Sequence, residues 1–178
     1  MKRNLSFILI ATVICLIMTS SVPSIKADAL IQNHKMAQVA IVVKDIDKAR
    51  RNWAMVLGMD LPEVSIAKSH PSRPTKFKGT PSGAEAKLAF FNLENIQIEL
   101  IQPLGGKSTW QEFLDTKGEG IHHIAFMVKG IDGLEKRFEM QGMPTDQNGG
   151  WDGGAYSYIN AMQMLGCELE LLENYRSN

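Results

Sequence analysis

The stretch QVAIVVKDID at residues 38–47 recurs as HIAFMVKGID at residues 123–132, with five of the ten positions identical. An internal repeat of this kind indicates that one folding unit has been used twice. Each copy later contains a second matching segment, which reads IEL at residues 98–100 and LEL at residues 169–171. The sequence therefore predicts two similar halves whose corresponding positions occupy equivalent places in the fold.

Each copy begins with a predicted strand that leads into a helix. Residues 36–43 and 121–128 are mostly apolar or small, as in strands that are packed on both faces. Asp47 offers an N-cap for the first helix. Asp132 and Glu135 resemble a capping box, which predicts the start of the second helix.

More strands follow each helix, after a stretch of turn-forming residues. Residues 69–83 are rich in proline and glycine, which predicts an exposed loop, and residues 149–154 form a Gly-rich stretch in the similar place of the second copy. Strands are expected at residues 87–92, 96–102, 155–160 and 166–172. These elements predict modules at about residues 36–103 and 121–175, joined by a short helix at residues 107–116.

The start of the chain has the pattern of a leader. Lys2 and Arg3 precede an apolar run at residues 5–18, which small and polar residues follow, as is typical of a cleavable signal peptide. The run is shorter than the roughly 20 residues that a membrane-spanning helix needs. We therefore expect a signal peptide at residues 1–29, a single domain at residues 30–178, no stable membrane anchor after leader removal, and a secreted or periplasmic location.

Composition narrows the classes of partner. Lys plus Arg equals Asp plus Glu at 19 each, so the chain lacks the positive charge excess that nucleic acids or anionic membranes attract. An apolar content of 44% suffices for an ordinary core. Removal of the leader leaves Cys167 as the one cysteine, so we expect no internal disulfide and interpret Cys167 as a buried filler of the last strand.

Four polar side chains stand at corresponding strand positions of the two halves: Gln38, Glu99, His123 and Glu170. Because side chains alternate across a strand, corresponding positions point the same way. Burying two carboxylates costs on the order of several kcal/mol unless a positive charge compensates them. One divalent cation would do so, with three oxygens and one nitrogen as ligands. This mixture suits Zn, Ni, Co, Mn or Fe and leaves coordination positions open.

A purely structural interpretation of these residues stays open beside the metal site. The two glutamates would then be exposed strand residues, Gln38 an edge residue and His123 a satisfied core histidine. The symmetry of the repeat favours the metal site. We interpret His34, His70 and His122 as structural or solvent-exposed, because alternation along the strand predicts that His122 faces away from His123.

The chain resembles the vicinal oxygen chelate superfamily, which contains glyoxalase I, methylmalonyl-CoA epimerase, extradiol dioxygenases and bleomycin resistance proteins. The resemblance covers nearly all of residues 36–173. It rests on GIHHIAF at residues 120–126, IELIQPLG at residues 98–105 and ELEL at residues 168–171. It implies an α+β fold in which two βαβββ modules form an open, cupped mixed sheet around a metal.

Carried over residue by residue, the resemblance implies the metal ligands Gln38, Glu99, His123 and Glu170. By the same resemblance, Glu170 leaves the metal to accept a proton from the substrate. Glu99 is the second candidate base, and Glu85 a weaker third that is more simply a solvated charge at a strand end.

The resemblance points to two branches of the superfamily. The Gln, Glu, His, Glu set resembles that of eukaryotic-type glyoxalase I, whereas the sequence around Glu99 and His123 resembles methylmalonyl-CoA epimerase. Val42 and Pro103 stand where glyoxalases have the Arg and Asn that hold glutathione, which argues against that mode of binding. Extradiol dioxygenases use two His and one carboxylate, and are least favoured.

We therefore expect an exported, metal-dependent, glyoxalase-like lyase or isomerase that acts through a metal-stabilised enediolate on a small substrate with vicinal oxygens. It would be lactoylglutathione-lyase-like or epimerase-like. The alternative is a non-catalytic small-molecule-binding or resistance-type protein of the same fold, with Trp151, Tyr156 and Tyr158 lining its pocket. The resemblance also makes a homodimer a candidate assembly, since many family members pair.

Overall fold

The computed structural model describes residues 29–175. The predicted signal peptide thus lies outside the described residues, apart from its last position. Within the described part, no helix combines the length and the apolar character needed to cross a membrane. The elements are β1 (Met36–Val42), α1 (Ile46–Leu57), β2 (Ser65–Ala67), β3 (Lys76–Phe77), β4 (Thr80–Pro81), β5 (Glu85–Asn92), β6 (Gln97–Gly105), α2 (Thr109–Lys117), β7 (Gly120–Met127), α3 (Ile131–Met140), β8 (Thr145–Trp151), β9 (Gly154–Ile159), α4 (Met162–Leu165) and β10 (Glu168–Asn174).

The ten strands of the described chain form one sheet in the order β2-β5-β6-β1-β7-β10-β9-β8-β3-β4. The first half contributes β2, β5, β6 and β1, and the second contributes β8, β9, β10 and β7 in mirrored order. The halves meet where β1 pairs antiparallel with β7, and each of these two strands pairs in parallel with the last strand of its own half. The predicted α+β fold of two βαβββ modules in a mixed sheet is confirmed.

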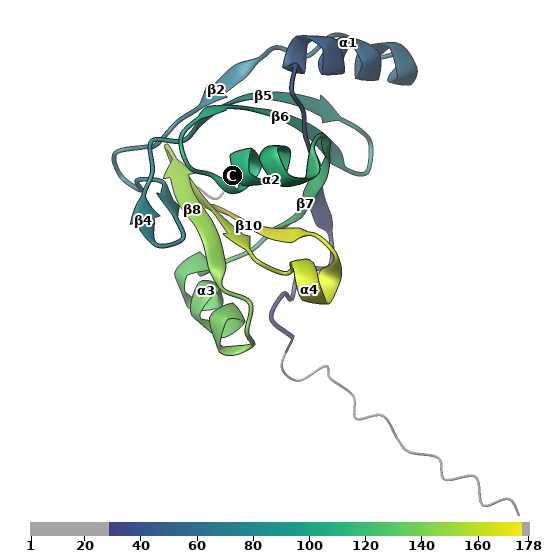
Figure 1. Cartoon of the computed structure of the whole chain (residues 1–178). Helices are drawn as coiled ribbons and strands as arrows, with labels where there is room; N and C mark the ends of the chain where they lie inside the picture. Colours follow the sequence, from purple (N-terminus) through teal and green to yellow (C-terminus); the bar gives the residue numbers. More distant parts are fainter. Residues whose placement is uncertain (1–28, 176–178) are drawn as a thin grey trace, which may run out of the picture.

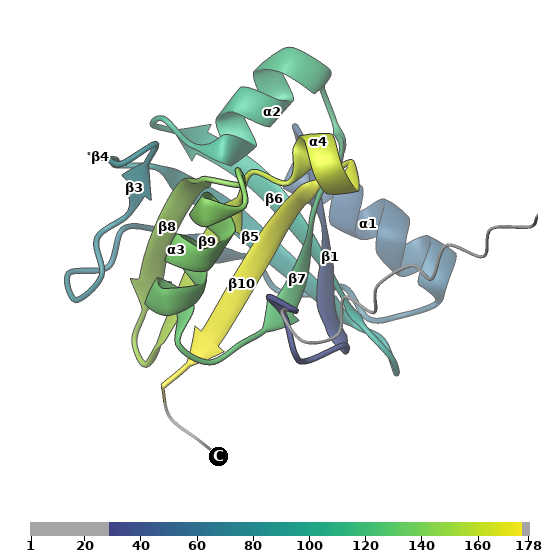
Figure 2. The same cartoon turned by 90° about the horizontal axis from the view of Figure 1, so that it is seen from below.

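The sheet curls into an open cup with helices on both of its faces. In Figure 1, α1 and α3 lie outside the curved sheet and α2 lies within it. Figure 2 shows α2 at one end of the strands. The buried clusters follow this layering, since Ile46 of α1 packs with Phe91 outside the first module and Phe138 of α3 packs with Leu171 outside the second. Inside the cup, Trp110 of α2 packs on Ala40.

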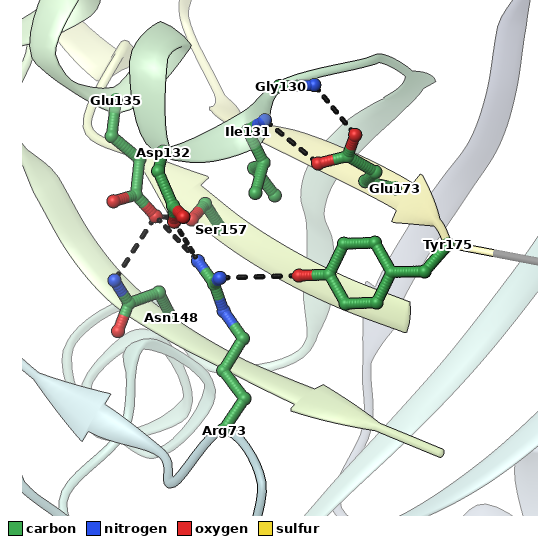
Figure 3. Close-up of polar contacts among 9 residues, drawn as sticks. All are labelled: Arg73, Gly130, Ile131, Asp132, Glu135, Asn148, Ser157, Glu173 and Tyr175. Atoms are coloured by element: carbon green, nitrogen blue, oxygen red, sulfur yellow. Dashed lines mark hydrogen bonds and ion pairs between the residues drawn. The ribbon is translucent and has the colours of Figure 1, made fainter. Parts of the chain in front are cut away.

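The Pro- and Gly-rich stretch at residues 69–83 contains two short strands, where the sequence predicts an exposed loop. Strand β3 pairs with β8 of the other module, with Phe77 opposite Gln147. Arg73 fastens the same stretch, because its Nη2 lies 2.8 Å from Oδ1 of Asp132 and its Nη1 donates to the hydroxyl of Tyr175 at 3.3 Å (Figure 3). The connection from β2 to β3 therefore links the two outer ends of the sheet.

The N-cap of helix α1 lies two residues earlier than predicted. Asp45 is the N-cap, and its Oδ1 accepts a hydrogen bond from the backbone N–H of Lys48 at 2.9 Å. Asp47, the predicted cap, lies in the first turn and forms an ion pair with Arg50 instead. The prediction failed because both aspartates suit a helix start, and the end of β1 fixes which of them stands outside the helix.

Helix α3 uses a cap from a distant strand in place of the predicted capping box. The carboxylate of Glu173 accepts hydrogen bonds from the backbone N–H groups of Gly130 at 2.6 Å and Ile131 at 2.9 Å (Figure 3). Asp132 makes no cap and pairs with Arg73, while Glu135 accepts hydrogen bonds from Ser157 and Asn148. The local pattern cannot reveal a carboxylate that β10 brings to the helix end.

Strand β7 contains a β-bulge at His122. Ala40 of β1 lies opposite His123, whereas the next residue, Ile41, lies opposite Ile121, so His122 has no residue opposite it. A bulge interrupts the alternation of side chains along a strand. His122 is only 1% exposed and its ring lies against that of His123. The expectation that the two histidines face opposite sides is therefore wrong.

Candidate metal centre

The candidate metal ligands lie on four adjacent strands in the middle of the cup: Gln38 on β1, Glu99 on β6, His123 on β7 and Glu170 on β10. Two rows of paired residues run across these strands. One row holds Gln97, Gln38, Ala125 and Glu170, and the other holds Glu99, Ala40, His123 and Glu168. The rows are related by the repeat, so each contains one glutamate ligand and one amide or imidazole ligand.

Three of these side chains converge. One ligand atom from each of Glu99, His123 and Glu170 lies within 4.8 Å of the other two. Nε2 of His123 stands 3.1 Å from Oε2 of Glu170 and 3.5 Å from Oε2 of Glu99. The three residues are 6%, 0% and 4% exposed, respectively. Two carboxylates and an imidazole are therefore packed together where little water reaches them.

The polar atoms in this cluster are not paired as ordinary hydrogen bonds. Nε2 of His123 and Oε2 of Glu170 are buried, and neither makes a hydrogen bond of acceptable angle within the described residues, although they lie close together. Unpaired buried polar atoms are costly, and a cation that accepts lone pairs from all three groups removes the cost. Two carboxylate oxygens and one imidazole nitrogen fit a divalent ion such as Zn, Ni, Co, Mn or Fe.

Burial and the mutual charges of the cluster shift the pKa values of His123 and Glu99. Burial lowers the pKa of His123, but the negative charges of Glu170 and Glu99, 3.1 and 3.5 Å from Nε2, outweigh burial and raise this pKa to about 9. Burial raises the pKa of Glu99, and the charge of Glu170 adds to that rise. In the metal-free protein a proton on His123 therefore provides the positive charge, and a bound metal ion would replace that proton.

Gln38 lines the same cavity as Glu99 and Glu170. Its side-chain Nε2 donates a hydrogen bond to Oε1 of Gln97, which in turn donates from Nε2 to Asn92 at 2.6 Å. This bond occupies the amide nitrogen and leaves the carbonyl oxygen as the atom of Gln38 that suits a metal. The role of Gln38 as the fourth ligand stays a prediction.

A cavity of about 570 Å³ opens above the cluster. Its lining combines the carboxylates with apolar and aromatic side chains, among them Leu88, Phe90, Trp110, Trp151, Tyr156, Tyr158 and Leu172. Lys68 and His70, from the connection after β2, also line it. The predicted aromatic lining by Trp151, Tyr156 and Tyr158 is therefore present. The size and the mostly apolar lining of this cavity are typical of a small-molecule site.

The other histidines and Glu85 occupy different environments. His34 is exposed and does not line the cavity, whereas His70 is half-buried, with Nδ1 2.8 Å from Oγ of Ser72. Glu85 is exposed at the start of β5 and does not line the cavity either. Cys167 is half-buried and precedes β10. The cavity wall thus includes His70, which sequence reasoning set aside.

Sequence reasoning also missed Glu168, which lies two residues before Glu170 on β10. It is buried, its Oε2 has no hydrogen-bond partner within residues 29–175, and burial with the nearby charge of Asp146 raises its pKa to about 7. Glu168 and Asp146 line a separate cavity of about 260 Å³ beside α2. The ELEL pattern at residues 168–171 could have identified it, because Glu168 and Glu170 share one face of the strand.

Comparisons with known proteins agree with this architecture. The uncharacterized protein YqjC of Bacillus subtilis is 27% identical over 143 residues, which cover 79% of this chain and 92% of YqjC. The mitochondrial methylmalonyl-CoA epimerase of Bos taurus is 30% identical over 99 residues, 55% of this chain and 49% of the bovine protein. The crystal structure of methylmalonyl-CoA epimerase from Mycobacterium tuberculosis has a TM-score of 0.56 at 24% identity, covering 79% of this chain and 87% of that chain.

The matching regions include most of the candidate centre. The family model described as "Glyoxalase/Bleomycin resistance protein/Dioxygenase superfamily" matches residues 37–159, which contain Gln38, Glu99 and His123. Glu170 lies beyond that match and is placed beside the others by the pairing of β10 with β7. With this match over more than half of its length, the chain belongs to the glyoxalase, bleomycin resistance protein and dioxygenase superfamily.

Proposed function

We propose that the protein is a metal-dependent isomerase or lyase that removes a proton from a carbon next to a carbonyl group of a small substrate. The observation that carries this proposal is the convergence of ligand atoms from Glu99, His123 and Glu170 within 4.8 Å beneath the cavity. When bound, a divalent ion supplies Lewis-acid polarisation of two neighbouring substrate oxygens, which favours the enediolate that proton loss produces.

The two carboxylates have complementary places in this proposal. Glu99 comes from β6 and Glu170 from β10, with β1 and β7 between them, so the bases stand on opposite sides of the centre. A carboxylate on each side of a carbon can remove a proton from one face and return it to the other. Glu170 is the first candidate base, and Glu99 is the second.

Epimerase-type proton exchange is better supported than a glutathione-dependent lyase. Val42 and Pro103, at the positions where glyoxalases have Arg and Asn, are buried and do not line the cavity. Relatives whose printed name is methylmalonyl-CoA epimerase support exchange that leaves the carbon skeleton intact. A coenzyme A thioester is a less suitable substrate if the protein is exported, so we propose a small α-hydroxy or α-keto compound.

Export is part of the proposal and has its own test. The leader-like segment at residues 1–29 supports a secreted or periplasmic location. Fractionation of cells that express the full chain, with mass spectrometry of the mature N-terminus, should find protein that begins near residue 30 outside the cytoplasm. Intact protein retained in the cytoplasm would contradict export and restore coenzyme A thioesters as candidates.

The proposed activity can be tested by metal analysis and by deuterium exchange. Purified mature protein should hold about one divalent ion per chain, and Glu99→Ala and His123→Ala should each lose it. Proton exchange in D₂O, followed by NMR across small α-hydroxy and α-keto compounds, should fall by roughly 100-fold or more in Glu170→Gln. Glu85→Gln is the matched control, because Glu85 is a strand carboxylate outside the cavity. Full metal content and exchange in Glu99→Ala would overturn the proposal.

A non-catalytic binder is the second candidate, and one observation favours it. Trp110, Tyr156 and Tyr158 form a cluster of rings on the cavity wall, with centroids 5.5 to 6.4 Å apart. Such a wall suits a flat apolar ligand. Metal-free protein that binds aromatic compounds with micromolar affinity, and shows no exchange activity after metal addition, would favour this candidate over the enzyme.

A further inference from the structure

His122 and His123 are adjacent in sequence, yet both rings lie on the inner side of β7. The bulge at His122 causes this arrangement, since it adds one residue to β7 between the partners of Ala40 and Ile41. The two rings meet at a centroid distance of 5.2 Å and an interplanar angle of 84°. The interrupted alternation therefore places the imidazole of His122 in contact with that of the candidate metal ligand His123.

The contact between the rings is a hydrogen bond. Nδ1 of His122 and Nδ1 of His123 lie 2.9 Å apart, and the two residues are 1% and 0% exposed. Only one hydrogen fits between two nitrogens at this distance, so one ring donates and the other accepts. Water cannot replace either partner at this degree of burial.

The surroundings of His123 decide which ring donates. Its Nε2 is directed at Glu170 and Glu99, at 3.1 and 3.5 Å. If Nε2 binds a metal, its lone pair is used and the ring hydrogen must be on Nδ1; if the ring is protonated, both nitrogens carry hydrogen. In both of these states His123 donates from Nδ1 and His122 accepts at Nδ1, whereas a neutral His123 with its hydrogen on Nε2 would reverse the hydrogen bond, a difference that the NMR measurement below detects.

We propose that His122 is a positioning residue for His123: by accepting the Nδ1–H hydrogen bond, it fixes the tautomer and the ring orientation that aim Nε2 between Glu99 and Glu170. The inference rests on the proposed metal-dependent function for its consequence, but the hydrogen bond itself exists with or without a metal. Partners of this kind raise the basicity of a metal-bound imidazole and hold its plane.

The packing around His122 makes it a rigid acceptor. Phe113 of α2 and Tyr158 of β9 contact its ring edge-on, with centroids 5.2 and 5.5 Å away. The ring also makes a hydrogen bond to the backbone of Thr109 at the start of α2. Because Thr109 is the first residue of α2, these contacts link His123 to the helix that closes one end of the cup. The backbone N–H of Thr109 also donates to Oε1 of Gln147 at 2.9 Å.

The test compares His122→Phe, which keeps a planar ring but has no acceptor, with His122→Asn, whose Oδ1 can accept at nearly the position of Nδ1. Zinc affinity, measured by competition with a chromophoric chelator, should fall about 10- to 100-fold in His122→Phe. It should stay within a few-fold of wild type in His122→Asn. Phe113→Leu is the control for packing, because it loosens the pocket of His122 without removing a nitrogen. Circular dichroism checks that each variant is folded.

The tautomer is measured separately by ¹H–¹⁵N NMR of the imidazole nitrogens in metal-free protein. We expect a protonated Nδ1 on His123 and an unprotonated Nδ1 on His122, and loss of this pattern in His122→Phe. Equal zinc affinity in wild type and His122→Phe, or an unprotonated Nδ1 on His123, would overturn the inference. If wild type binds no metal but shows the expected tautomers, the proposed function fails while the hydrogen bond between the histidines stands.

Discussion

The side-chain amide of Gln38 donates a hydrogen bond to Gln97, its direct neighbour on the parallel strand β6. In the second module, the corresponding neighbour of His123 is Glu168 on β10. The repeat thus places one polar side chain beside each of the two non-acidic candidate ligands. Gln97 occupies the amide nitrogen of Gln38, so the carbonyl oxygen of Gln38 is left to bind a metal ion.

Removal of that neighbour should loosen the candidate ligand. In Gln97→Ala, Gln38 loses its hydrogen-bond acceptor and its amide can rotate, so we expect a few-fold loss of zinc affinity, compared with roughly 10-fold in Gln38→Ala. Chelator competition measures both. Gln111→Ala is the control, because Gln111 lies on α2 and bonds to Asp115. A Gln38→Ala protein with wild-type affinity would remove Gln38 from the ligand set.

Metal affinity should rise with pH. The pKa of His123 is about 9 in the metal-free protein, so at pH 7 a binding metal must displace the proton from this ring. We expect affinity to increase about tenfold per pH unit between pH 7 and 8.5 and to level off above about 9. Burial also raises the pKa of Glu99. Release of a proton from Glu99 therefore makes the dependence of metal affinity on pH steeper at lower pH.

Calorimetry in buffers with different ionisation heats provides the direct count of released protons for this prediction. About one proton per metal ion is expected at pH 7.5. Glu85→Gln should release the same number, since Glu85 is exposed and lies outside the cavity. Metal binding with no proton release and equal affinity at pH 7 and 8.5 would contradict the protonated state of His123.

Glu168 should make the metal-free protein less stable as pH rises. Its pKa is about 7 in the folded chain, above the ordinary value of 4.5, so its contribution is fully present below pH 4.5 and is lost as pH rises through 7. Glu168→Gln should therefore be more stable than wild type at pH 8, by roughly 1 kcal/mol, because solvent in the cavity that Glu168 lines screens its charge. The difference should vanish near pH 4.5. Urea unfolding of chelator-treated protein at the two pH values measures it, and a pH-independent difference would argue against the raised pKa.

The cap of α3 offers a direct comparison between a distant and a local carboxylate. Glu173→Ala removes the acceptor of the N–H groups of Gly130 and Ile131 and should lower the free energy of unfolding by roughly 1 to 2 kcal/mol. Asp132→Ala removes an exposed partner of Arg73 and should cost about 0.5 kcal/mol or less. Thermal or urea denaturation ranks the two variants. A larger loss in Asp132→Ala would restore the capping box that the sequence predicts.

The sequence predicted the repeat, the strand and helix that open each module, and the paired-module fold, because these depend on local apolar patterns and on similarity between segments. It also singled out Glu99, His123 and Glu170, since the repeat pairs Glu99 with Glu170 and His123 with Gln38. It did not predict the strand β3, whose pairing with β8 joins Phe77 to Gln147, 70 residues away in sequence, or the strand β4, which pairs with β3.

Three features depended on the tertiary structure alone. The bulge at His122 is set by the register between β1 and β7, which no pattern within β7 contains. The cap of α3 comes from Glu173 because β10 ends beside the helix, and the raised pKa of Glu168 comes from burial near Asp146. The sequence determined which chemical groups are available and on which strands they stand. Only folding decided their distances and burial, which set whether a carboxylate or an imidazole holds its proton.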